Sequence, residues 1–512
     1  MKKRKRQRKY GQRPAAAIKA PSRFWKAFES PWFLAGVLVF AALLRLAHVW
    51  AIRKTPFFLS LDIDPRVYDE WAQKIAAGDW IGKGIFYQDP LYPYFLAILY
   101  RIFGRDLMLV RIVQVAFGVG TCWLTAALGR QIFGKAVGNV AGLVAALFAP
   151  SIFYEAEIEK TFLSVFLVAC FLVFALKRTT LSRLLAGVFL ALACLTRANL
   201  LVFVPLGFLI ALFELSSEPE TESTAKDSEH GDPSLILGMF ERGSIAPAFA
   251  FVAGACIVLF PVAWRNHHVG GEWVLATSQG GQNFYLGNNP ENHTGGYIAL
   301  PFQRPNPLFE QDDFKAEAEI KTGHALTPAQ ASSYWYRRGI SHILDHTGFA
   351  LGMFGRKFAV FWNDYEVPDN QDIYFLARDS WVLRLPLVTF GLLVPLALLG
   401  AVAFFRKKRE VRLLAEFTGL YCLTVVAFFV LSRYRMQIVP VMAVLTAAGG
   451  QWLYLQLKES RWPRFTFSRR TSQKRSRRTT RRSPRIRAVQ TLCAISECCS
   501  LASVTWRSPR DS

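Results

Sequence analysis

Two aspartates stand in the stretch FLSLDIDPRVYDEWAQKIAAGD (residues 58–79), which follows a long apolar segment. A carboxylate at the edge of a membrane can take a proton from a hydroxyl group, and it is costly there unless it has a role. An aspartate before a proline also commonly starts a turn or caps a helix. That simpler explanation accounts for Asp64, which precedes Pro65, but it leaves Asp62 unexplained.

Other charged and polar residues recur at the ends of later apolar segments. They are Glu155, Glu157, Glu159 and Lys160 in FYEAEIEKTF, Arg197 and Asn199 in LTRANLL, and Arg433 and Arg435 in LSRYRMQIVP. If the N-terminus lies inside, all of them fall at one level of the membrane, the outer interface. A cavity there would combine carboxylates that accept a proton with cations that hold a phosphate leaving group. Taken singly, each such charge is more often a snorkelling or topology-setting residue.

The composition indicates which elements position these residues. The chain of 512 residues is 52% hydrophobic and 19% charged, which is too apolar for an ordinary soluble enzyme and is typical of a multi-span membrane protein. Its net charge of +24 is concentrated in two tails, since residues 1–30 carry +10 and residues 458–512 carry +12. Basic tails beside apolar segments indicate cytoplasmic ends and contact with anionic lipids. Nucleic-acid binding is the minor alternative and is not predicted, because no recognition fold accompanies the tails.

Ten apolar segments predict an all-α polytopic membrane protein with about ten transmembrane helices and further interfacial helices. They cover residues 32–52, 107–129, 136–154, 161–177, 181–197, 199–215, 244–264, 384–405, 411–431 and 436–456. The loops on the inner side are then basic, except for the acidic segment 216–243, which is predicted to be a disordered linker. The eight cysteines match neither a disulfide framework nor a zinc pattern.

Two long stretches, residues 53–106 and 265–383, are predicted to lie outside. The first contains an amphipathic helix that starts behind Asp64 and Pro65. The second is predicted to be a small α/β or irregular unit, in which EWVLATS is a strand and GGQNFYLGNNPENHTGG is a loop. A helix with a capping box should begin at Thr327. The predicted units are a basic tail (1–30), an N-terminal transmembrane module (31–264), an extracytoplasmic unit (265–383), C-terminal transmembrane helices (384–456) and a basic disordered tail (457–512).

The motifs of the first outside stretch occur in a characteristic order. Asp64 stands four residues before Tyr68, and the pattern A..I..GDW and the aromatic-proline run FYQDPLYPYFLA follow. Together with FYEAEIEKTFLSVFL, LTRANLL, FWNDYEVPDN and SRYRMQIVP, this order resembles the C-superfamily glycosyltransferases, especially the protein O-mannosyltransferases and lipid A aminoarabinose transferases. The resemblance extends over most of residues 30–450.

This resemblance implies an enzyme that transfers a hexose or pentose from a polyprenyl-phosphate donor to a hydroxyl group of a protein, lipid or surface glycan. Transfer would proceed by a single inverting displacement, with Asp64 as the general base and Asp62 as the less favoured candidate. The implied ligands of the donor phosphate are Arg433, Arg435, Arg66 and Lys160. The implied substrate-binding residues are Tyr68, Tyr87, Glu155, Glu157, Arg197, Asn288, Asn363 and Glu366.

The sequence departs from the family's pattern at two positions. Many relatives have an aspartate before an apolar run in the second loop, where this chain has Lys160. Aminoarabinose transferases have a lysine before the proline of the aromatic-proline run, where this chain has Asp89. Both departures argue against aminoarabinose transfer itself. The family is divided on metal use, so no cofactor is assigned and the use of a divalent cation is left open.

Two other function classes compete with this interpretation. The first is a transporter, such as a flippase of lipid-linked saccharides, and the second is a non-catalytic component of surface-polysaccharide assembly. The lack of internal repeats and the gathering of charge at one face, rather than at the midplane, weigh against a transporter. The expected location is a bacterial inner membrane, with both termini cytoplasmic and the active site facing the exterior.

Overall fold

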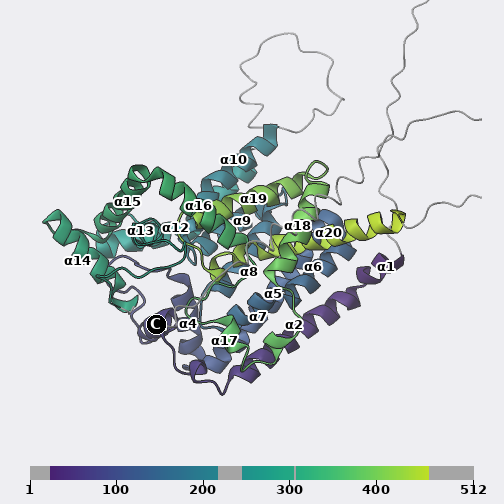
Figure 1. Ribbon diagram of the computed structural model, residues 1–512, viewed down its shortest axis with the longest axis horizontal. Coiled ribbons are helices and arrows are strands. Elements are labelled where there is room, and N and C mark those ends of the chain that lie inside the picture. The colour runs from purple at the N-terminus through teal and green to yellow at the C-terminus, as the bar shows by residue number, and fades with distance from the viewer. Residues whose placement is uncertain (1–22, 217–244, 305–306, 461–512) are drawn as a thin grey trace, which may run out of the picture. The chain divides into compact units, whose positions relative to one another are not determined.

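The computed structural model describes residues 23–216, 245–304 and 307–460 (Figure 1). These residues form helices joined by short connections, and within them the β-type pairing consists of an isolated bridge between Phe148 and Val388. The prediction of an all-α membrane protein is confirmed. Most of both basic tails and nearly all of the acidic segment lie outside the described residues.

Each of the ten predicted apolar segments contains a helix. These helices are α2 (Pro31–Ile52), α5 (Leu107–Phe133), α6 (Lys135–Leu147), α8 (Thr161–Ala175), α9 (Thr180–Cys194), α10 (Phe203–Ser216), α12 (Ala246–Gly270), α18 (Phe390–Phe404), α19 (Arg409–Val426) and α20 (Val439–Ser460). By length and composition, four helices of the described residues can cross a membrane: α2, α5, α12 and the segment Ser432–Lys458 around α20. Most of the others are shorter apolar helices. The short helix α1 (Arg23–Lys26) and the 3-10 turn η1 (Ala27–Glu29) precede α2.

Three interruptions of these helices carry charged residues. After α6 the chain bends at Phe148 and continues as α7 (Ala149–Ala156), and α7 and α8 are separated by residues 157–160. Between α9 and α10 lies the 3-10 turn η3 (Ala198–Val202). Before α20, two successive 3-10 turns, η6 (Ser432–Tyr434) and η7 (Met436–Ile438), replace the α-helical backbone. Such interruptions present side chains and backbone groups that a continuous helix would not.

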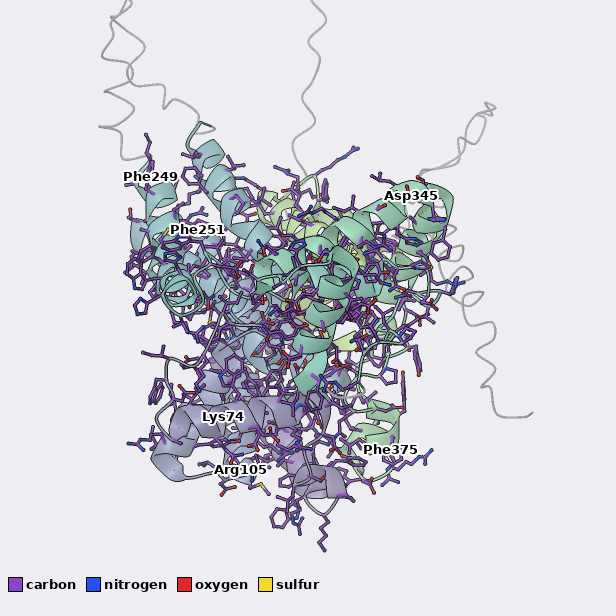
Figure 2. All side chains as sticks on the ribbon, turned by 90° about the vertical axis from the view of Figure 1, so that its left-hand side faces the viewer. Lys74, Arg105, Phe249, Phe251, Asp345 and Phe375 are labelled. Carbon is purple, nitrogen blue, oxygen red and sulfur yellow. The ribbon has the colours of Figure 1, made fainter. Side chains whose placement is uncertain are left out.

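The first loop stretch, residues 53–106, folds into η2 (Pro56–Phe58), α3 (Ile63–Ala76) and α4 (Leu91–Phe103). The predicted amphipathic helix is α3, which begins at Ile63 rather than behind Pro65. Its buried face packs against α4 and the large apolar core that also contains parts of α5, α8 and α20. Arg105, labelled in Figure 2 close to Lys74 of α3, pairs with Asp69 at 2.9 Å and anchors the middle of the helix.

The second loop stretch, residues 265–383, is helical as well. Its elements are α13 (Gly280–Gly287), η4 (Pro307–Phe309), α14 (Glu310–Thr322), α15 (Pro328–Asp345), α16 (Thr347–Trp362), α17 (Ile373–Leu376) and η5 (Val382–Arg384). Figure 1 shows α13, α14 and α15 grouped together, and α15 packs against both of the others. The predicted capping box at Thr327 is confirmed.

Two predictions for this stretch were wrong. The segment EWVLATS is irregular and forms no strand, and the glycine-rich segment that was predicted as a loop contains α13. Its glycines serve close packing rather than flexibility. A Cβ atom at Gly281 would lie 1.8 Å from the carbonyl oxygen of Ser332, and one at Gly287 would lie 2.0 Å from that of Phe428. Glycine is therefore needed where α13 touches neighbouring backbone.

Candidate active site

Two adjoining cavities lie where the helix interruptions meet the loop stretches. We call the first the cationic cavity. It has a volume of about 290 Å³, and its charged wall consists of three cations, Lys160, Arg197 and Arg433, and one carboxylate, Asp89. Apolar side chains from η3 and α19 complete part of the wall, including Leu201 and Val425. A space with this lining suits a ligand that has an anionic group and an apolar portion.

The second space, which we call the acidic cavity, has a volume of about 260 Å³. Its wall includes the carboxylates of Asp64, Glu310 and Asp369. Six residues line both cavities: Lys160, Gln279, Asn283, Phe429, Arg433 and Tyr434. The two spaces therefore meet at a boundary that contains two cations.

Asp64 reaches the acidic cavity from the first turn of α3. The preceding residue, Ile63, has a φ of 56°, which is strained for a β-branched side chain. Buried Tyr68 lies one turn further along the helix and lines the same cavity. Asp62 occupies the N-cap position, but its exposed side chain makes no capping hydrogen bond. The structure thus separates the two aspartates, since Asp64 faces the cavity and Asp62 faces away from the buried side of α3.

Arg433 gathers three carboxylates around one guanidinium group. Its Nη1 donates to Asp64 Oδ2 at 2.8 Å and to Glu159 Oε1 at 3.1 Å. Its Nε lies 2.6 Å from Asp369 Oδ2. The side chain of Arg433 is only 9% exposed, so these charges interact in a poorly solvated space. Arg433 alone cannot neutralise three carboxylates, and the cluster is net negative.

The carboxyl groups of this cluster titrate differently because their partners differ. Burial favours the neutral form of Asp64, but attraction to Arg433 and Lys160 outweighs burial and holds the pKa of Asp64 below its ordinary value. For Asp369, burial outweighs the attraction of Arg433, and repulsion by Asp64 adds to it, so its pKa is raised. Burial also raises the pKa of Glu310 to about 7. Asp64 is therefore the carboxylate of the acidic cavity most firmly held in its charged form.

Arg197 has a different environment from Arg433. Its Nη2 donates to the hydroxyl of Thr161 at 3.1 Å and to the carbonyl of Arg433 at 3.2 Å, and its guanidinium lies over the ring of Tyr434. Among the described residues, no carboxylate forms a salt bridge with it. Arg197 interacts electrostatically with Asp89, Glu159 and Asp369, but its guanidinium is in direct contact with none of them and can donate to an anion in the cavity it lines.

The two departures from the family's pattern meet in the structure. Lys160 Nζ donates to Asp89 Oδ2 at 2.5 Å, and both side chains are buried. The sequence has a cation where many relatives have an acid, and an acid where aminoarabinose transferases have a cation. These two departures therefore contact each other as one buried ion pair, which keeps the local charge balanced.

Reversing one member of this pair should be costly. Lys160→Asp would place two carboxylates against each other in a buried space, and we expect it to lower thermal stability strongly, by the roughly 3–5 kcal/mol typical of a broken buried pair. The double variant Asp89→Lys/Lys160→Asp should recover at least half of that loss, because it restores opposite charges. Thermal unfolding of the purified proteins in detergent measures both effects. A double variant no more stable than Lys160→Asp would show that the pairing is unimportant.

Among the predicted residues that line neither cavity are Arg435, Glu366, Arg66 and Asn363. Arg435 lies only two residues after Arg433, but it donates to backbone carbonyls near the end of α16 and pairs with Glu366 at 2.7 Å. Arg66 is exposed and pairs with Glu70 one turn along α3. Asn363 is exposed. The Arg435–Glu366 pair thus braces the loop stretch behind the site.

Three further predicted residues are structural neighbours of the site. Glu155 forms a buried salt bridge with Arg45 of α2. Glu157 is buried close to Arg433 in a small recess, beside Glu159. Asn288 accepts a hydrogen bond from the buried Lys357. These contacts fix the interruption between α6 and α8, and the second loop stretch, around the cavities.

Tyr87 contacts Glu310, a residue of the acidic cavity that was not predicted from the sequence. Its hydroxyl donates to Glu310 Oε1 at 2.8 Å. Asp369 was missed too, although it stands in the motif FWNDYEVPDN, and Asn370 donates to Asp64 at 3.5 Å. Glu310 begins a polar helix with no recognisable motif, so the sequence offers no comparable signal for it.

The carboxylates bear on the open question of a metal ion. Within the described residues, no group of three or more His, Cys, Asp or Glu side chains is arranged to hold one. The guanidinium of Arg433 contacts one oxygen of each of Asp64, Glu159 and Asp369. No step below uses a metal ion.

One segment of the chain matches the model of a known protein family. Residues 88–222 match the family model described as dolichyl-phosphate-mannose-protein mannosyltransferase. No curated protein matches the chain. The matched segment includes Asp89, Lys160 and Arg197, and it ends before Glu310 and Arg433.

Solved structures of membrane glycosyltransferases are distantly similar. The oligosaccharyltransferase of Archaeoglobus fulgidus, in complex with zinc and sulfate, has 16% identity and a TM-score of 0.43, covering 83% of this chain and 50% of that one. ArnT from Cupriavidus metallidurans, bound to undecaprenyl phosphate, has 12% identity and a TM-score of 0.36, covering 82% of this chain and 78% of that one. The chain thus spans about half the length of the archaeal enzyme. The family match over residues 88–222 confirms the resemblance to the C-superfamily glycosyltransferases that the sequence motifs predict.

Proposed function

We propose that the protein is an integral membrane glycosyltransferase that moves a sugar from a polyprenyl-phosphate donor to an acceptor hydroxyl group. The observation that carries the proposal is the boundary between the two cavities. Lys160 and Arg433 line both cavities, whereas Arg197 lines only the cationic cavity and Asp64 lines only the acidic one. We further propose a bacterial inner membrane, cytoplasmic termini and a site that faces the exterior.

The cationic cavity is proposed to hold the donor. Arg197 and Lys160 would bind the phosphate, because a guanidinium and an ammonium group donate charge-assisted hydrogen bonds to phosphate oxygens. The apolar side chains of Leu201, Val425 and Phe428 would contact the first isoprene units. As the bond to the sugar breaks, these cations would stabilise the charge that develops on the phosphate.

The acidic cavity is proposed to hold the acceptor. Asp64 would take the proton of the acceptor hydroxyl while that oxygen attacks the anomeric carbon of the sugar. The bond between the anomeric carbon and the phosphate oxygen would break, with its electron pair leaving on the lipid phosphate. A single displacement of this kind inverts the anomeric configuration. Holding both reactants in line across the boundary would supply much of the rate enhancement.

Transfer assays test this function directly. The full-length protein, reconstituted in lipid nanodiscs, would be incubated with radiolabelled polyprenyl-phosphate sugars and with extracts of surface glycans, lipids and proteins. We expect the label to move to one acceptor class, with release of an equal amount of polyprenyl phosphate. If no donor loses its sugar under any of these conditions, the proposed function is wrong.

Arg197→Gln should weaken donor binding. Loss of a charge-assisted contact costs about 1.5–3 kcal/mol, which raises the donor KM by roughly 10- to 100-fold. Inhibition by free polyprenyl phosphate should weaken by a similar factor. Arg66→Gln is the matched control, since its exposed side chain pairs only with Glu70 among the described residues and should leave the donor KM unchanged. Equal donor affinities for wild type and Arg197→Gln would remove this residue from the phosphate site.

A further inference from the structure

The mechanism above leaves two carboxylates of the acidic cavity unused, Asp369 and Glu310, and of these only Asp369 contacts Arg433. Glu310 is the first residue of α14 and lines the same wall as Asp64 and Asp369. Those two aspartates share Arg433, whereas no cation among the described residues forms a salt bridge with Glu310. Its described hydrogen bond comes from the hydroxyl of Tyr87, at 2.8 Å. Glu310 is therefore a carboxylate with a neutral partner in a cavity of charged pairs.

This difference determines which of the two carboxyl groups, Asp64 or Glu310, holds a proton more firmly. Arg433 stabilises the ionised form of Asp64, so a protonated Asp64 loses its proton readily. Burial, together with repulsion by the charge of Asp64, raises the pKa of Glu310 to about 7, and the bond from Tyr87 opposes this shift only in part. Between these two groups, the proton is more stable on Glu310 near neutral pH.

We propose that Glu310 is the terminal acceptor of the proton that Asp64 removes from the acceptor hydroxyl, with Tyr87 holding its carboxylate in place. The proposal rests on the proposed glycosyltransferase function. The O–H bond of the acceptor breaks, its oxygen bonds to the anomeric carbon, and the phosphate leaves with the electron pair of the broken bond. The proton passes from Asp64 to Glu310, which becomes neutral and later releases the proton to water. Asp64 is ionised again and pairs with Arg433.

This arrangement has a consequence for the pH dependence of transfer. Glu310 can accept a proton only when it is ionised, so the wild-type rate should fall as the pH drops through about 7. For a single group that titrates there, the rate at pH 8 is about tenfold higher than at pH 6. Asp64 titrates well below this range, because its pKa is lowered, and Asp369, whose pKa is raised to about 6, titrates at its acid end.

Two substitutions test the proposal, because each should change the pH profile of transfer in a different way. Glu310→Gln removes the acceptor, so the rate at pH 8 should fall at least tenfold and the change between pH 6 and pH 8 should nearly disappear. Tyr87→Phe removes the hydrogen bond that favours the ionised carboxylate, so the acid limb should move to higher pH. Asp312→Asn, at an exposed position of the same helix, is the control and should retain the wild-type profile. A merely structural role for Glu310 would lower the rate without changing the shape of the profile.

Transfer by the full-length protein in nanodiscs, followed from pH 5.5 to 9 with saturating donor, gives the decisive profiles. A Glu310→Gln variant with the wild-type slope between pH 6 and pH 8 overturns the proposal. If Glu310→Gln does not fold, the acid limb of Tyr87→Phe decides in its place, and an unshifted limb overturns the proposal. Failure of the wild-type protein to transfer any sugar would contradict the proposed function instead, so the two failures are distinguishable.

Discussion

Asp64→Asn is expected to lower kcat for sugar transfer by about 10²- to 10⁴-fold, the range found when a general base is removed. The amide has nearly the same shape as the carboxylate, but it cannot take the proton of the acceptor hydroxyl. The fold should survive, because Arg433 keeps its contacts with Glu159 and Asp369. The donor KM should change much less than kcat, since Asp64 lines the acidic cavity and not the cationic one.

The neighbouring aspartate supplies the control for this experiment. Asp62→Asn alters an exposed side chain that makes no capping bond, and we expect its kcat to stay within about twofold of wild type. Initial rates with labelled donor, combined with thermal unfolding of each variant, separate catalytic loss from loss of fold. Near-normal transfer by Asp64→Asn would rule it out as the base.

Arg433→Gln is expected to have the second large effect, on both stability and activity. Without the guanidinium, three buried carboxylates face one another, and removing one partner of a buried charge pair costs about 3–5 kcal/mol. The pKa of Asp64 should rise, because the cation that lowers it is gone. Asp64 would then hold a proton over a wider pH range, and with its cation gone we expect kcat at pH 7 to fall at least about tenfold. Residual activity should increase with pH, as the carboxylates ionise again.

Arg435→Gln is a demanding control, because Arg435 is as deeply buried and also pairs with a carboxylate, that of Glu366. It should lose comparable stability while keeping the wild-type pH profile, since it lines neither cavity. Thermal unfolding and pH profiles of both variants, measured side by side, make the comparison. Identical pH profiles for Arg433→Gln and the wild type would contradict the role assigned to Arg433.

The residues that could be predicted from the sequence are those that end apolar helices. Asp64, Lys160, Arg197 and Arg433 stand beside long apolar segments, and the cost of charge at a membrane edge singles them out. The same rule also selected Arg435, which lines neither cavity. Two adjacent 3-10 turns direct Arg433 and Arg435 to different partners. Position along the chain cannot distinguish Arg433 from Arg435, since the direction of each side chain depends on the local backbone conformation.

Glu310 and Asp369 could not be selected in this way. Both belong to the second loop stretch, whose path depends on close contacts between distant segments, such as the contact of Gly287 with Phe428. Composition predicted a loop around that glycine, because glycine and asparagine are most often turn residues. Here the missing side chain allows backbone to approach backbone, which becomes visible only when both partners are placed. The acidic cavity was consequently half predicted, with Asp64 identified and its two companion acids missed.

The two cavities differ in how freely the residues of their walls can be substituted. The cationic cavity takes its cations from apolar helix ends, where a substitution also disturbs the packing of the membrane core. Residues of one short segment line the acidic cavity and not the cationic one: Tyr297, Ala299, Gln303, Arg304, Pro307 and Glu310. Substitutions in this short segment can change the space proposed for the acceptor while the residues proposed to bind the donor phosphate stay the same. Under the proposed function, one scaffold can in this way serve different acceptors while it keeps one class of donor.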